Sequence, residues 1–88
     1  MELEQRLGER ADSLTPSERR IGETILANPQ LVAFGTVADV AEAARVGTAT
    51  VVRFAVKIGF DGYSQLQASV QGEVSGQLRP AVERIRDQ

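Results

Sequence analysis

Helix start and stop signals follow one another closely along this 88-residue chain, and they constrain its fold more than any other feature. Segment 15–18, Thr-Pro-Ser-Glu, is a capping box in which Thr15 and Glu18 can each accept a hydrogen bond from the other's amide. Its proline suits the first helical position, where a missing N–H costs no hydrogen bond. A second start signal lies at 36–39, and Pro29, Gly35 and Gly59 favour helix ends.

Apolar residues between these signals recur at spacings of three and four, as they do on one face of an α-helix. They predict a first helix that ends near 12–13 and a second helix at 15–28 that buries Ile21, Ile25 and Leu26. One helical turn is predicted at 30–34, followed by helices at 36–45 and 48–58. A last helix is predicted from 63 to a bend or an end between 76 and 80. Segment 81–88 could continue as a charged amphipathic helix. No stretch alternates with period two between hairpin turns. The predicted fold class is therefore all-α, a small helical bundle of about five helices.

Composition excludes most enzyme classes. The chain has no cysteine and no histidine, which removes disulfides, thiolate and histidine metal sites, cysteine nucleophiles and the commonest general base. Glu18 and Asp39 are explained as helix caps, and Tyr63 is expected to pack in the core with its hydroxyl at the surface. Gly72 and Gly76 follow no predicted strand and match no phosphate-binding loop. We therefore predict no enzyme activity, no catalytic residue, no metal and no cofactor.

The sequence also predicts where the protein works. Its apolar runs are only a few residues long, too short to cross a bilayer. The amino terminus lacks the basic and apolar regions of a secretory signal. We therefore predict a cytoplasmic protein without membrane contact.

Charge is distributed unevenly, although the net charge is only −2, from ten basic and twelve acidic side chains. Between 43 and 60 the charged residues are Arg45, Arg53 and Lys57, with no acid among them. Two short helices joined by a brief turn, the second locally basic, are typical of a helix-turn-helix. The alternative is a chance gap among the acids, since charge runs are usually solvated faces.

Helix-turn-helix geometry gives individual positions a role. Ala41 supplies the small residue where the two helices cross, and Val46 supplies an apolar plug in the turn. If Val51 and Phe54 are buried with Ala55 and Ile58, the opposite face of 48–58 is free to enter a DNA groove. That face carries Thr48, Ala49, Val52, Arg53, Val56 and Lys57. Its small residues permit close approach and its hydroxyls can bond to bases or phosphates, while Val52 either contacts a thymine methyl or is an ordinary exposed valine.

The segment from Leu14 to Leu66 resembles the amino-terminal helix-turn-helix domain of the RpiR family of bacterial transcription regulators. The resemblance rests on 14–18 (Leu-Thr-Pro-Ser-Glu), Ile21, Ile25-Leu26, Asn28-Pro29, 40–44 (Val-Ala-Glu-Ala-Ala), 49–54 (Ala-Thr-Val-Val-Arg-Phe) and 59–63 (Gly-Phe-Asp-Gly-Tyr). It implies that 48–58 is the recognition helix, with Thr50 and Arg53 as its DNA contacts. Such proteins typically join this domain to a carboxyl-terminal sugar isomerase-type domain that binds a phosphosugar, and they regulate carbohydrate metabolism genes. The resemblance thus implies a DNA-binding domain at 1–78 and, at 79–88, the start of a linker toward an effector domain absent from this chain.

Three positions depart from the family pattern. Arg45 stands where glycine is usual in the turn, so it is expected to be mildly strained at φ > 0, and its charge could reach a DNA phosphate. Gly47 replaces the usual serine, which moves the expected helix cap to Thr48. Gln67 replaces a common basic residue and thins the expected positive surface.

The expected partners are double-stranded DNA and a second copy of the chain. The apolar stripes Leu3-Leu7-Ala11 and Val70-Val74-Leu78 either form a dimer interface or close the monomer's own core. Arg53 could pair with an acid, Asp39, Glu42 or Asp61, instead of DNA. The alternative function is a helical protein-interaction or dimerisation module without DNA binding.

Overall fold

The structure is a computed structural model that describes residues 2–86, with side-chain surroundings for residues 2–75. The described chain forms six α-helices and one 3-10 turn and contains no strand, which confirms the all-α prediction. In chain order the elements are α1 (Glu2–Glu9), η1 (Ala11–Ser13), α2 (Pro16–Ala27), α3 (Pro29–Phe34), α4 (Val37–Ala44), α5 (Thr48–Lys57) and α6 (Tyr63–Arg86). The structure has one α-helix more than expected, because the single helical turn predicted at 30–34 forms a helix of its own, α3.

Both predicted start signals form complete capping boxes. At α2, Thr15 Oγ1 accepts from the Glu18 amide at 3.2 Å, and Glu18 Oε1 accepts from the Thr15 amide at 2.7 Å. At α4, Thr36 and Asp39 make the same pair of bonds, at 3.2 and 2.8 Å. These bonds satisfy amides that the first turn of a helix otherwise leaves without a partner, so the helix starts are fixed by residues three apart in sequence.

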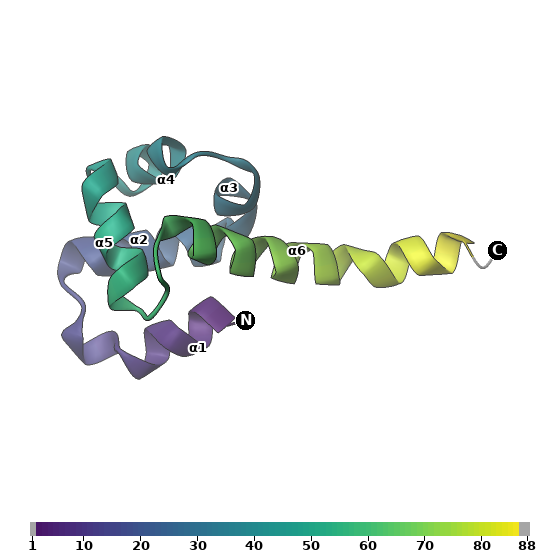
Figure 1. Ribbon diagram of the computed structural model, residues 1–88, viewed down its shortest axis with the longest axis horizontal. Helices are drawn as coiled ribbons and strands as arrows, with labels where there is room; N and C mark the ends of the chain where they lie inside the picture. The colour runs from purple at the N-terminus through teal and green to yellow at the C-terminus, as the bar shows by residue number, and fades with distance from the viewer. Residues whose placement is uncertain (1, 87–88) are drawn as a thin grey trace.

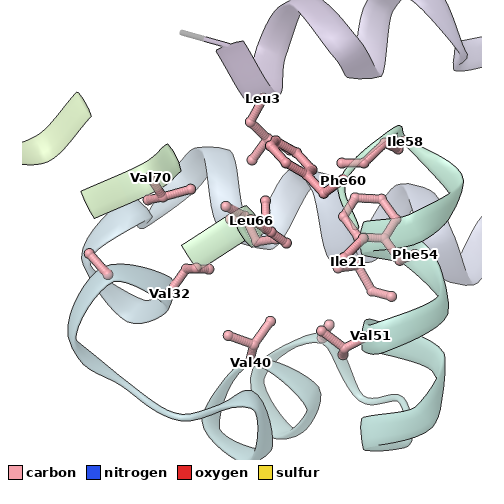
Figure 2. Close-up of a cluster of buried hydrophobic side chains, with 14 of the residues drawn as sticks. Leu3, Ile21, Val32, Val40, Val51, Phe54, Ile58, Phe60, Leu66 and Val70 are labelled. Carbon is pink, nitrogen blue, oxygen red and sulfur yellow. The ribbon is translucent and has the colours of Figure 1, made fainter. Parts of the chain in front are cut away.

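The core draws a side chain from each α-helix (Figure 2). The largest fully buried side chains are Phe54, Leu3, Ile21, Ile25, Ile58, Leu66, Val32, Val40, Val51 and Val70. Leu3, Val70 and Val74 therefore close the monomer's own core, so the proposed dimer stripes are wrong at these three positions; Leu78 lies outside the described side chains. At these three positions the monomer core is the correct alternative; Leu7 is half-buried against that core, and Ala11 is exposed.

Two further expectations about side chains need correction, those for Leu26 and Tyr63, and Gln67 has a role that was not predicted. Leu26 is 37% exposed, because it lies about 100° around α2 from the buried Ile25, on the side that borders the open space between α1 and α2. The Tyr63 hydroxyl lies inside the bundle rather than at the surface, with no hydrogen-bond partner among the described residues. The pKa of Tyr63 is raised mainly by this burial and, to a smaller extent, by the nearby charge of Asp39. Gln67 is structural: its Nε2 donates to the carbonyls of Val32 and Gly35 and so closes the end of α3.

Helix α6 does not end between Gly76 and Pro80. It runs from Tyr63 to Arg86, and its far half extends beyond the bundle (Figure 1). Two glycines cost only about 1 kcal/mol each in a helix interior, so they do not by themselves stop a helix.

Candidate nucleic-acid interface

Helices α4 and α5 pack against each other as the two helices of a helix-turn-helix. The turn between them is residues 45–47. Arg45 adopts the left-handed conformation, with φ 59° and ψ 48°, and the Val46 amide donates to the Ala41 carbonyl at 2.9 Å. Val46 packs half-buried against the core and Ala41 is 3% exposed, as predicted for the plug and the helix crossing. The strain expected at Arg45 is confirmed, because non-glycine residues adopt positive φ rarely.

The cap of α5 differs from the prediction. Gly47, not Thr48, is the N-cap residue, in an extended conformation with φ −77° and ψ 158°. Its carbonyl accepts from the amides of Thr50 and Val51, at 3.1 and 3.3 Å. Glycine serves as an N-cap at a cost of only a few tenths of a kcal/mol relative to serine or threonine, so no side-chain cap is needed here. Thr48 is the first helical residue, and its exposed hydroxyl is not used in capping.

Helix α5 has two contrasting faces, as predicted. Val51, Phe54 and Ala55 are fully buried and point into the core, together with Ile58 just beyond the helix (Figure 2). The opposite face is exposed and carries the predicted residues Thr48, Ala49, Val52, Arg53, Val56 and Lys57, with Thr50 half-buried at its edge. We call this set of exposed residues, with Thr50, the α5 face. It contains no acid, and its first two turns combine hydroxyls, small side chains and one arginine.

The cations near the α5 face are used differently. Arg53 and Arg45 are exposed and form no ion pair with any side chain that the structure describes, so the expected alternative partners of Arg53 are not used. Lys57 instead bonds to Glu18 Oε1 at 2.7 Å. Lys57 lies at the carboxyl end of α5, so the positive charge available to a ligand comes from Arg53 near the middle of the helix and Arg45 in the preceding turn.

Glu18 links the capping box of α2 to α5. Burial alone would raise the pKa of the Glu18 carboxyl, but hydrogen bonds with Lys57 and Thr15 outweigh it and lower the pKa. A carboxylate whose pKa is lower in the folded state stabilises the fold above its unfolded pKa of about 4.3. That stabilisation is lost as the pH falls through the folded-state pKa.

Glu18→Gln is expected to destabilise the domain by about 1 kcal/mol at pH 7, because glutamine keeps the capping box but removes the charge that holds Lys57. The difference from wild type should shrink as the pH falls from about 5 to about 3, where Glu18 becomes protonated. Urea denaturation followed by far-UV circular dichroism at several pH values measures it. A difference that stays constant with pH would contradict the assignment.

Three arginines that the sequence did not single out hold the ends of α4 and α5. Arg20 Nε donates to the Ala44 carbonyl at 3.4 Å, so Arg20 is an exposed arginine beside the turn that holds Arg45. Arg10 Nε donates to the Lys57 carbonyl at 2.9 Å. Arg6 donates to the Ile58 carbonyl at 3.4 Å and lies over the Phe60 ring, 4.4 Å from its centre. Cations suit helix carboxyl ends, but these pairs lie 24 to 52 residues apart in sequence, so no local pattern reveals them.

Comparison with known families agrees with this geometry. A family model described as "Helix-turn-helix domain, rpiR family" matches residues 1–77. The chain belongs to this family. The match includes α1 and α6 up to residue 77, so the rpiR-family domain is longer than the segment 14–66 that carries the resemblance.

The relatives of this rpiR-family domain include named regulators. An HTH-type transcriptional regulator of Haemophilus influenzae is 39% identical over 70 residues, covering 80% of this chain and 24% of that protein. The HTH-type transcriptional regulator HexR of Pseudomonas aeruginosa is 38% identical over 65 residues, covering 74% and 23%. The "bifunctional protein glk" of Paraburkholderia xenovorans is 30% identical over 74 residues, which is 84% of this chain and 12% of that protein.

These comparisons confirm the predicted class, a DNA-binding domain of a transcription regulator. The chain spans about a quarter or less of the curated relatives named here. No solved structure matches it. Within the described helices, none combines the length and apolarity needed to cross a membrane.

Proposed function

We propose that the α5 face enters the major groove of double-stranded DNA and reads its sequence. The observation that carries this proposal is the contrast between the two faces of α5: one is fully buried in the core, and the other is exposed, free of acids and rich in small and hydroxyl-bearing side chains. Because α5 is anchored by its buried face, the exposed face is presented in a fixed orientation. A preorganised helix of this kind suits the width of the major groove.

The positions on the α5 face divide into two roles. Thr48, Ala49, Thr50 and Val52 lie in the first two turns, which usually contact base edges in a recognition helix. Arg53 lies one step farther and can hold a phosphate, or reach a guanine edge with two hydrogen bonds. We expect Arg45, with Arg20 beside the turn, to add phosphate contacts. Lys57 completes the predicted set, but its ammonium already holds Glu18, so we expect it to contribute less than Arg53.

The role of the whole protein follows from the resemblance and from the length of the relatives. We infer a cytoplasmic bacterial regulator of carbohydrate metabolism genes that acts as a homodimer. Residues 1–78 would be its non-catalytic DNA-binding domain, and 79–88 the start of a linker to an effector domain that binds a phosphosugar. This chain would contact the phosphosugar only through that domain. The small share of each relative that the chain covers supports a larger protein of this kind.

The experiment that tests DNA binding selects and sequences genomic fragments bound by the protein at low salt, and then measures Arg53→Ala on the selected site and on random DNA. If Arg53 reads a base, the variant should lose about 1–3 kcal/mol on the selected site and far less on random DNA. If it holds a phosphate, which we favour, the loss should be similar on both and the salt slope should fall by about one.

The matched control is Gln30→Ala, which shortens an exposed polar side chain on α3 that is no part of the α5 face and is expected to leave affinity nearly unchanged. Full affinity for both DNAs in folded Arg53→Ala would contradict the role of Arg53. No retained DNA at micromolar wild-type protein would favour the alternative, a protein-interaction module.

A further inference from the structure

An apolar groove lies between α1 and α2. Its volume is about 430 Å³, and its lining includes Leu7, Leu14 and Leu26 with the small residues Gly8, Ala11 and Gly22. Gly22 allows Leu7 to pack closely on α2, because a Cβ there would meet both Leu7 methyl carbons at 3.1 Å and the leucine side chain would have to shift. Leu26 is 37% exposed along the groove, although the sequence predicts it to be buried. The groove thus leaves the exposed Leu26 side chain and its small neighbours open for another molecule to cover.

Charge is distributed asymmetrically along the groove. Helices α1 and α2 run in roughly opposite directions (Figure 1). Arg19 lies at the end where the two helices are connected, and its Nη2 donates to the Ala11 carbonyl at 3.3 Å. Glu23 lies one turn farther along α2, and Glu4 lies on α1 on the far side of Leu7 from Ala11. One end of the groove is therefore basic and the other acidic.

We propose that a second copy of this chain fills the groove, with the two α1–α2 pairs packed antiparallel about a two-fold axis. In such a contact the same patch meets itself, so residue i contacts j and j contacts i. Reversing one copy brings its Arg19 opposite Glu4 and Glu23 of the other, twice, and brings the exposed Leu26 side chain of each copy against the Ala11 and Leu14 end of the partner's groove. The groove is thus complementary to itself in both charge and apolarity. This self-complementarity favours a second copy over an unrelated partner.

The α1–α2 contact is compatible with DNA binding. The α5 face points away from the bundle core, and the groove-lining residues are all outside the α4–turn–α5 unit. This inference assigns a surface to the homodimer proposed above and does not depend on DNA contact by α5. A protein that dimerises but does not bind DNA would therefore overturn the proposed function and leave this interface standing.

Sedimentation velocity over a concentration series tests the interface with Leu26→Lys. We expect the wild-type chain to dimerise, and Leu26→Lys to weaken dimerisation at least about tenfold, because a charge is buried against the partner's apolar groove. The matched control is Phe34→Lys, at a side chain that is 72% exposed on α3 and outside the groove. A wild-type chain that stays monomeric up to about 1 mM, or equal weakening by both variants, would overturn the proposal.

A charge exchange tests the two-fold arrangement separately. Arg19→Glu makes the groove rim acidic, and Glu4→Arg with Glu23→Arg makes it basic, so each variant alone should dimerise less than wild type. Mixing the two should give heterodimers, because every rim contact then joins opposite charges. Circular dichroism spectra of the variants that match the wild-type spectrum establish that the variants are folded. If the mixture associates no better than either variant alone, the antiparallel pairing is wrong.

Discussion

Ala49→Glu is expected to weaken DNA binding about 100-fold or more in a domain that stays folded, which corresponds to about 2.7 kcal/mol. Ala49 is exposed on the first turn of α5, at the centre of the proposed base-reading region. A carboxylate there would face base edges and phosphates, and its bulk would prevent close approach. The same carboxylate lies near the amino terminus of a helix, where negative charge stabilises the helix dipole. The loss of binding is therefore expected without loss of stability.

Ala68→Glu is the matched control for this prediction. Ala68 is also an exposed alanine within a helix, but it lies on α6, away from the α5 face. The substitution adds the same charge and volume, so both variants change the net charge of the domain equally. Fluorescence anisotropy with a labelled selected site measures both affinities, and thermal melting verifies folding. Equal losses in the two variants would indicate a general charge effect and would contradict the position of the α5 face on DNA.

Phe54→Ala is expected to destabilise the domain by about 3–5 kcal/mol, enough to unfold much of a small domain whose total stability is about 5–15 kcal/mol. Phe54 is fully buried, is the largest such side chain, and anchors α5 in the core (Figure 2). Truncation removes its apolar contacts and leaves a cavity that the surrounding helices fill only in part. Equilibrium urea denaturation gives the change in free energy of unfolding.

Val56→Ala is the control for the loss of an apolar side chain from the same helix. Val56 is 53% exposed, so its truncation should change stability by less than about 0.5 kcal/mol. Of the two variants, only the Phe54 variant should lose secondary structure at 37 °C. A Phe54 variant as stable as the Val56 variant would mean that α5 is not held by the core in the way described.

Much of the candidate site could be predicted because it depends on short-range order. The alternation of buried Val51 and Phe54 with exposed Val52 and Arg53 follows from helical periodicity alone. The strain at Arg45 was expected because the resembled family usually has glycine at this turn position, where φ is positive. The cap at Gly47 was predicted wrongly, since the threonine at the next position is the better capping residue in isolation. There the conformation of the turn, fixed by α4, overrode the local preference.

What the sequence determined by itself is the set of helices and where they begin. Thr15 with Glu18, and Thr36 with Asp39, make their bonds within one helical turn, so the same bonds can form before any tertiary contact exists. Tertiary structure decided which exposed charges are available and which apolar side chains are left uncovered. Lys57 finds Glu18 39 residues away, Arg20 reaches Ala44, and Leu26 stays at the surface. Such contacts depend on how whole helices are placed against one another, and no local pattern of residues encodes that placement.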